Sequence, residues 1–168
     1  MKNGLFSQRF RRTKRSPESQ AYHATNLHFA VMINEEPNSK KLLRILYAED
    51  MRELRDVARI ALSREGHLIE CVCDGQEALD RITADPEAFD LLMTDHHMPN
   101  LDGLELVTHV RTLPFTGKIL VFSSELSPTI AEAYIELKVD RMLSKPVFPS
   151  ELRHLLAEMF SPMAFASH

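Results

Sequence analysis

Hydrophobic and polar positions follow two different periods along residues 42–161. Five short apolar runs, typical of buried strands, are separated by longer stretches in which apolar residues recur every three or four positions. The runs predict strands at 42–48, 67–73, 89–94, 118–122 and 139–143. Because strands that alternate with helices form a parallel sheet with helices on both faces, this order predicts an α/β fold.

The stretches between these runs have the spacing and the end signals of amphipathic helices. Gly66 follows the first stretch, 51–65, as a helix-ending residue. Asp74 and Asp102 precede the next two as N-caps. Ser127 and Pro149 mark the start of the last two, each with a proline at the first helical position. The apolar face of the first helix is predicted to consist of Leu54, Val57, Ala58, Ala61 and Leu62.

Residues 1–41 differ in composition from the rest of the chain. The net charge of −4 combines a basic segment, 1–41, with an acidic remainder. This segment is polar, contains Pro17 and has no sustained hydrophobic period, so we expect a flexible extension. Met32 offers an alternative start of translation. The predicted boundaries are 1–41 for the extension, 42–161 for the folded domain and 162–168 for a short tail.

The composition excludes several classes of protein. No apolar run approaches the roughly 18 residues of a membrane span, and no apolar segment of a secretory signal follows the basic N-terminus. We therefore expect a cytoplasmic protein. The acidic remainder argues against a nucleic-acid surface. Cys71 and Cys73 are the only cysteines, and we expect two reduced core thiols, because a metal site would need further soft ligands.

Polar residues that can carry chemistry follow four of the five apolar runs. Glu49 and Asp50 follow the first run, Asp95 the third, Ser123 the fourth and Lys145 the fifth. Ligands of open α/β sheets bind outside the carboxyl ends of the strands, so we expect these side chains in one pocket. Three neighbouring carboxylates repel each other unless a cation is present, and Mg²⁺ prefers oxygen ligands. The set suits Mg²⁺ and a phosphoryl group.

Each of the single polar residues admits a chemical role beside an ordinary structural one. Asp95 could be a metal ligand, a base or a nucleophile that attacks phosphorus. Lys145 could pair with Asp95 or with a phosphate oxygen, and Ser123 offers a hydroxyl donor. The peptide bond before Pro146 is a candidate for the cis form. Taken alone, each residue is more simply a helix cap or a loop residue, and only their joint placement favours a function.

At these residues the chain resembles the receiver domain of two-component response regulators, the fold of the bacterial chemotaxis regulator. The resemblance covers about residues 42–161 and rests on the segments LRILYAED, DLLMTDHHMPNLDGLEL, ILVFSSE and LSKPV, in order and at the family's spacing. It implies a flavodoxin-like doubly wound (βα)5 fold with a five-stranded parallel sheet in the order 2-1-3-4-5.

The resemblance also implies how the protein is phosphorylated. Asp95 would accept a phosphoryl group from a phosphohistidine on a sensor histidine kinase or a histidine phosphotransfer protein. Mg²⁺ would be bound by Asp50, Asp95 and the backbone carbonyl of His97, with Glu49 acting mainly through water. His96 and His97 are otherwise interpreted as ordinary exposed loop residues.

A switch is implied in the same way. Ser123 and Lys145 would hold the phosphoryl oxygens and shift the surface of the fourth helix, fifth strand and fifth helix, where a downstream protein would bind. The family usually has Tyr or Phe where this chain has Met142, which can fill the gap but offers neither a ring nor a hydroxyl. His97 and Glu125 occupy the positions through which the family tunes the phosphoryl lifetime.

Functions from different classes stay open at this point. The favoured one is a stand-alone receiver that is not an enzyme. Only SPMAFASH follows the last predicted helix, and this segment is too short for a DNA-binding or enzymatic output domain. We therefore expect the output to be protein contact or an onward phosphorelay. An aspartyl-phosphate phosphatase would need a D-x-D pattern, but His97 lies two residues after Asp95. A flavin module would need a phosphate-binding loop where Glu49 and Asp50 stand. The last alternative is a degenerate receiver that acts as a phosphorylation-independent scaffold.

Overall fold

A parallel β-sheet forms the centre of the protein. The computed structural model describes residues 41–125 and 127–161, so residues 1–40 of the predicted N-terminal extension and the whole C-terminal tail lie outside the described residues. The strands in this part of the chain are β1 (Arg44–Ala48), β2 (Leu68–Val72), β3 (Leu91–Asp95), β4 (Lys118–Ser123) and β5 (Arg141–Ser144). Their order is β2-β1-β3-β4-β5, all parallel, which confirms the predicted flavodoxin-like fold.

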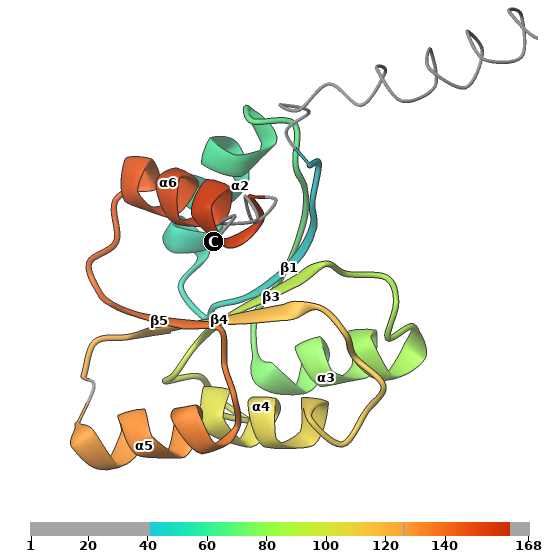
Figure 1. Ribbon diagram of the computed structural model, residues 1–168, viewed down its shortest axis with the longest axis vertical. Helices are drawn as coiled ribbons and strands as arrows, with labels where there is room; N and C mark the ends of the chain where they lie inside the picture. Colours follow the sequence, from blue (N-terminus) through green and yellow to red (C-terminus); the bar gives the residue numbers. More distant parts are fainter. Residues whose placement is uncertain (1–40, 126, 162–168) are drawn as a thin grey trace, which may run out of the picture. The chain divides into compact units, whose positions relative to one another are not determined.

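Helices cover both faces of this sheet. They are α2 (Arg52–Ser63), α3 (Gly75–Ala84), α4 (Gly103–Val110), α5 (Pro128–Glu136) and α6 (Pro149–Met159). Figure 1 shows α2 and α6 on one face and α3, α4 and α5 on the other. The fourth and fifth helices expected from the sequence are thus α5 and α6. None of the helices in the described ranges is long and apolar enough to cross a membrane.

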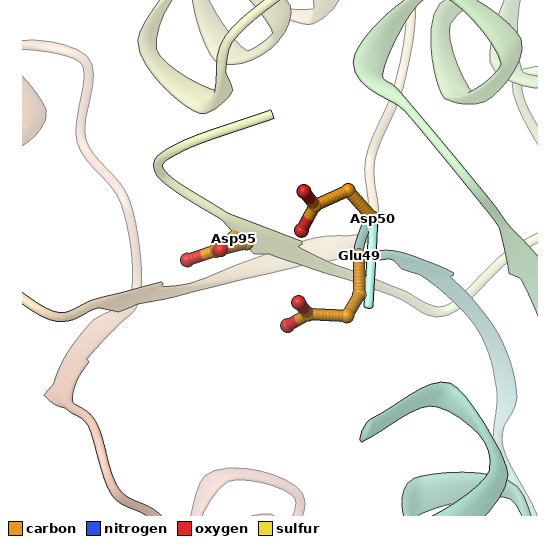
Figure 2. A group of neighbouring side chains, drawn as sticks. All are labelled: Glu49, Asp50 and Asp95. Carbon is orange, nitrogen blue, oxygen red and sulfur yellow. The ribbon is translucent and has the colours of Figure 1, made fainter. Parts of the chain in front are cut away.

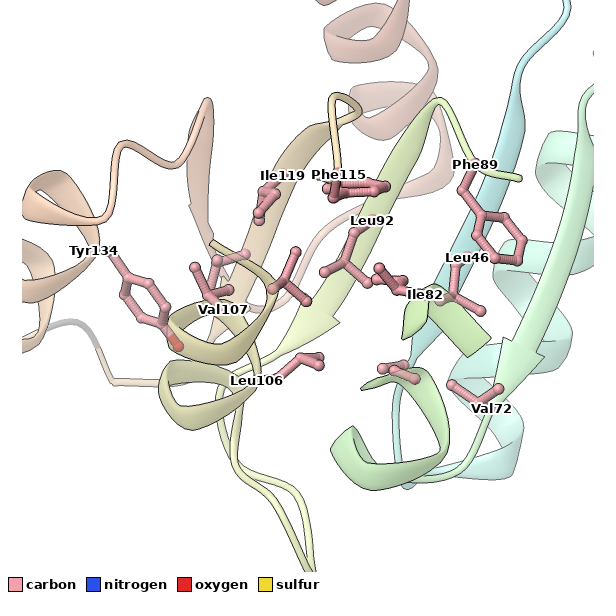
Figure 3. Packing of buried hydrophobic residues seen from close by; sticks show 14 residues of the cluster. Leu46, Val72, Ile82, Phe89, Leu92, Leu106, Val107, Phe115, Ile119 and Tyr134 are labelled. Carbon is pink, nitrogen blue, oxygen red and sulfur yellow. The ribbon is translucent and has the colours of Figure 1, made fainter. Parts of the chain in front are cut away.

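The strands divide their side chains between two hydrophobic cores. Successive residues of a strand point to opposite faces, so Leu46 joins the core under α3, α4 and α5, whereas Ile45 joins the core under α2 and α6. Figure 3 shows the first of these cores. β3 is buried at all of its positions, as expected for a central strand of a doubly covered sheet. Asp95, its last residue, is therefore carried by the most enclosed strand.

Local signals at the helix ends confirm the predicted starts. The side chains of Asp74, Asp102 and Ser127 each accept a hydrogen bond from the backbone N–H three residues later. Pro149 is the first residue of α6, as predicted. Gly66, beyond the end of α2, has a φ of 88°, a left-handed conformation that glycine adopts without steric cost.

Two details of the predicted packing are wrong. Val57 was assigned to the buried face of α2 but is 49% exposed, because it lies at the margin of the apolar stripe. Cys73 was expected in the core but is exposed, since it lies beyond Val72, the last residue of β2 that pairs with β1. Cys71 is partly buried, and both thiols are free, as expected.

Candidate functional site

The carboxyl ends of β1 and β3 bring three carboxylates together. Glu49 and Asp50 follow β1, and Asp95 is the last residue of the neighbouring β3. One oxygen of each side chain lies within 4.8 Å of the others. Figure 2 shows the three carboxylates gathered at this edge of the sheet. The donor set consists of oxygens alone, which fits Mg²⁺.

The three carboxylates differ in their burial and in the number of hydrogen bonds that they accept from the protein. Glu49 is fully buried: its Oε2 accepts hydrogen bonds from Tyr47 (3.0 Å) and Lys145 (2.8 Å), and its Oε1 accepts one from the backbone of Met51 (3.3 Å). Asp50, in contrast, is exposed. This difference favours Asp50 as a direct metal ligand and a more indirect role for Glu49.

Lys145 joins two of the carboxylates. Its Nζ lies 2.8 Å from Glu49 Oε2 and 2.8 Å from Asp95 Oδ2. Burial lowers the pKa of Lys145, but its bonds to Asp95 and Glu49 outweigh this, so the pKa is raised. Burial raises the pKa of Glu49, and Lys145 offsets only part of that increase. The raised pKa keeps Lys145 protonated at neutral pH, so its ammonium places a positive charge between the two buried acids. The bond between Lys145 and Pro146 is cis, as the sequence suggested.

Tyr47 is a residue of this site that the sequence reasoning missed. Its hydroxyl donates to Glu49, and burial, followed by the nearby Glu49 charge, raises the pKa of the phenol. Its ring packs edge-on against Phe122, with centroids 5.9 Å apart. Residues two apart on an extended chain share a face, so the spacing of Tyr47 and Glu49 was the signal that could have found it.

The predicted switch residues lie around β4 and β5. Ser123 is buried at the end of β4, where its Oγ donates to the carbonyl of Glu125 (2.8 Å) and accepts from the N–H of Glu125 (3.1 Å). Met142 is partly buried and packs against the core under α5. Ser123 thus ends a strand next to the one that ends in Asp95, while its hydroxyl is held by its own loop. The predicted roles of these residues stay predictions.

His96 differs most from what the sequence suggested. The interpretation as an exposed loop residue is wrong for it, because it is 6% exposed and its Nδ1 lies 2.8 Å from the hydroxyl of Tyr134. Burial lowers the pKa of His96, and the neighbouring His97 adds to this effect. His97 itself is exposed, and the centroid of its ring lies 4.5 Å from the centroid of the His96 ring. No local pattern connects His96 to Tyr134, so the contact could not be read from the sequence.

Comparisons with known proteins agree with this geometry. The family model described as the response regulator receiver domain matches residues 45–157. The two-component response regulator ORR41 of Oryza sativa subsp. japonica is 31% identical over 122 residues, which cover 71% of this chain and 96% of that protein. The response regulator MprA of Mycobacterium avium (strain 104) is 38% identical over 117 residues, 70% of this chain, but the match spans only 49% of that protein.

Solved structures give the same result. The chemotaxis response regulator CheY4 of Vibrio cholerae is similar with a TM-score of 0.65 and 26% identity, over 71% of this chain and 99% of that one. A CheY-like receiver domain protein from Methanospirillum hungatei JF-1 has the same TM-score and identity, over 70% and 93%. With the matching family model, the relatives and the sheet order, the chain belongs to the response regulator receiver domain family.

Proposed function

We propose that this protein is a stand-alone response regulator receiver that accepts a phosphoryl group on Asp95 from a phosphohistidine donor in a Mg²⁺-dependent reaction. The observation that carries the proposal is the position of the Asp95 carboxylate, between the acids that follow β1 and the ammonium of Lys145. The match over 96% of the rice regulator supports the stand-alone form, because that relative is little longer than the matched segment.

The chain's own groups orient the nucleophile. Asp95 Oδ1 accepts a hydrogen bond from the backbone N–H of His96 (2.8 Å), and Oδ2 is held by Lys145 (2.8 Å). In the transfer, a bond forms between an Asp95 oxygen and phosphorus, the bond from phosphorus to the donor nitrogen breaks, and its electron pair returns to the imidazole. A bound Mg²⁺ supplies charge neutralisation for the phosphoryl oxygens. Asp50, Asp95 and the backbone carbonyl of His97 would hold it, with Glu49 acting through water.

A change of partners would turn phosphorylation into a signal. Lys145 can move its contact from Asp95 to a phosphoryl oxygen, and Ser123 can exchange the Glu125 carbonyl for another phosphoryl oxygen. Both shifts act on β4, β5 and the adjoining loops, so the altered surface is that of α5, β5 and α6. Met142 would accommodate the movement of Ser123 through its flexible side chain. His97 and Glu125, both exposed near the site, would set the phosphoryl lifetime.

This function defines the partners and the setting of the protein. The phosphoryl donor is a sensor histidine kinase or a histidine phosphotransfer protein. The output is contact of the α5–β5–α6 surface with a downstream protein, or relay of the phosphoryl group to a further histidine. The setting is cytoplasmic, and the protein acts as a signalling domain whose only catalysis is its own phosphorylation and dephosphorylation.

Intact-mass measurement after incubation with acetyl phosphate and Mg²⁺ tests the proposal. We expect a gain of one phosphoryl group that requires Mg²⁺ and is lost in Asp95→Asn, because the amide is not a nucleophile toward phosphorus. Asp80→Asn is the matched control, since Asp80 is an exposed acid on α3 outside the cluster. Labelling that persists in Asp95→Asn would contradict the assignment of the phosphoacceptor.

A further inference from the structure

We propose that the hydrogen bond between His96 and Tyr134 transmits the phosphorylation state of Asp95 to helix α5. This inference rests on the proposed function. It assigns His96 and Tyr134 as a pair of positioning residues that regulate it. His96 directly follows the phosphoacceptor, and Tyr134 lies in α5. Their side chains meet at 2.8 Å, with ring centroids 5.7 Å apart and an interplanar angle of 78°.

His96 is bonded directly to the group that changes charge. Its backbone N lies 2.8 Å from Asp95 Oδ1 and 2.8 Å from the carbonyl oxygen of Phe122 in β4, so its N–H is shared between two acceptors. A phosphorylated Asp95 is an acyl phosphate, whose carboxyl oxygens carry less charge than those of a free carboxylate. Hydrogen bonds to ionised acceptors are the stronger ones, so this bond weakens when the phosphoryl group is added. Phosphorylation therefore shifts the shared His96 N–H away from Asp95 and towards the Phe122 carbonyl, and in this way it acts on the backbone of His96.

The surroundings of His96 leave little room to absorb its movement. Its carbonyl accepts a hydrogen bond from the N–H of Gly103, the first residue of α4, at 2.9 Å. A Cβ on Gly103 would lie 2.3 Å from the Asp95 carbonyl oxygen, 2.9 Å from His96 Cα and 3.0 Å from the Tyr134 hydroxyl. Gly103 is thus in close contact with the end of β3 and with the Tyr134 hydroxyl. Because the interior is close-packed, a displacement of His96 is passed on to these neighbours.

At the other end of the bond, Tyr134 anchors its helix. It has no exposed surface, and it is the only residue of α5, all of which is described, that is buried. Figure 3 shows its side chain pointing from α5 towards α4. A lost hydrogen bond would leave the Tyr134 hydroxyl unsatisfied in the core, so α5 must adjust when His96 moves. Ile130 of α5 packs against the same core but is only partly buried, so Tyr134 is the most deeply buried contact of this helix.

This route does not need an aromatic residue on β5. Met142, at the position expected to couple Ser123 to the surface, packs against the same core as Tyr134 but carries no hydroxyl. Tyr134 provides an aromatic hydroxyl from α5 itself. The structure thus holds a direct connection from the end of β3 to α5, separate from the one through Ser123 and Met142.

Hydrogen–deuterium exchange of α5 tests this connection. The probe is beryllium fluoride with Mg²⁺, a stable mimic of the phosphoryl group, compared with Mg²⁺ alone. In the unaltered protein, we expect the probe to change exchange in α5 by at least about threefold. In Tyr134→Phe, which keeps the ring and removes only the hydroxyl, we expect this change to disappear while acetyl phosphate still labels Asp95. Ile135→Ala, at an exposed position of α5, is the matched control and should keep the response.

The outcomes separate the two proposals. A full α5 response in Tyr134→Phe overturns the coupling and leaves the proposed function intact. The same holds if the unaltered protein is labelled but shows no α5 response. An unaltered protein that is never labelled and never responds overturns both. If the hydrogen bond is purely structural, Tyr134→Phe will change the exchange of α5 equally with and without the probe. That result also contradicts the coupling. If Tyr134→Phe does not fold, His96→Leu removes the other partner, and the same outcomes apply.

Discussion

At the scale of single residues, one lysine balances two buried acids while a third acid stays exposed. Lys145 contacts both Glu49 and Asp95, so the buried part of the site is partly neutralised before any cation binds. Asp50 is within reach of the same point but faces solvent. A buried carboxylate without a partner would be costly, so this division of roles keeps the site stable and still open to a metal.

Replacing Asp50 tests that division. We expect Asp50→Asn to weaken Mg²⁺ binding by about tenfold or more, because an amide oxygen carries no charge to offer the cation. Thermal stability should change little, since Asp50 is exposed. Isothermal titration of Mg²⁺ measures the affinity. Glu53→Gln, an exposed acid in the first turn of α2, is the control, and an unchanged affinity in Asp50→Asn would show that the metal binds elsewhere.

At the scale of elements, the ends of helices are set by single polar side chains. Asp74 Oδ1 accepts from the N–H of Glu77 at 2.8 Å, and Oδ2 accepts from the side chain of Asn100 at 2.7 Å. The bond from Glu77 lowers the pKa of Asp74 below its ordinary 3.8, more than burial raises it, and Asn100 adds to the decrease. Asp74 thus ties the start of α3 to the loop that follows Asp95.

This cap makes the stability of the protein depend on pH in a defined direction. Because the pKa of Asp74 is lower in the folded chain, its stabilisation is present above pH 3.8 and is lost as the pH falls through the folded value. We expect Asp74→Ala to lower the free energy of unfolding by about 1 kcal/mol at pH 7 in urea denaturation, and this difference to shrink towards pH 3. In Asp74→Asn, whose amide caps at any pH, most of the stability should remain. A difference that does not vary with pH would contradict the assignment.

The same scale shows what could be predicted from the sequence. The strands, the helix starts and the gathering of Asp95 and Lys145 at one edge follow from local periods, caps and the rule for parallel sheets. Contacts between elements that are distant in the sequence have no comparable local signal. His96 and Tyr134 are 38 residues apart, and each is unremarkable in its own segment. Cys73 was misplaced because the end of pairing between β1 and β2 is a property of two strands, not of one.

At the scale of the whole molecule, the acidic cluster exists only when the sheet has formed. Its acids come from the ends of two strands that are neighbours in space and separated by α2, β2 and α3 in the sequence. An unfolded chain holds them apart and offers no common site. Any cation that binds this cluster therefore stabilises the folded state by mass action.

Chemical denaturation with and without Mg²⁺ measures this linkage. At ten times its dissociation constant, Mg²⁺ should raise the free energy of unfolding by about 1.4 kcal/mol. Sodium chloride at matched ionic strength controls for charge screening. Equal stabilisation of Asp50→Asn and the unaltered protein by Mg²⁺ would show that the effect arises outside the acidic cluster.

The bridge from Lys145 to Glu49 also bears on how the protein is made. The two residues are 96 positions apart, so Glu49 and Asp95 leave the ribosome well before Lys145 does. A nascent chain therefore displays its acids before the ammonium that balances them has been synthesised. The charge arrangement is complete only after β5 has formed, so a receiver domain built in this way gains its full set of charges only after nearly all of its described fold has been translated.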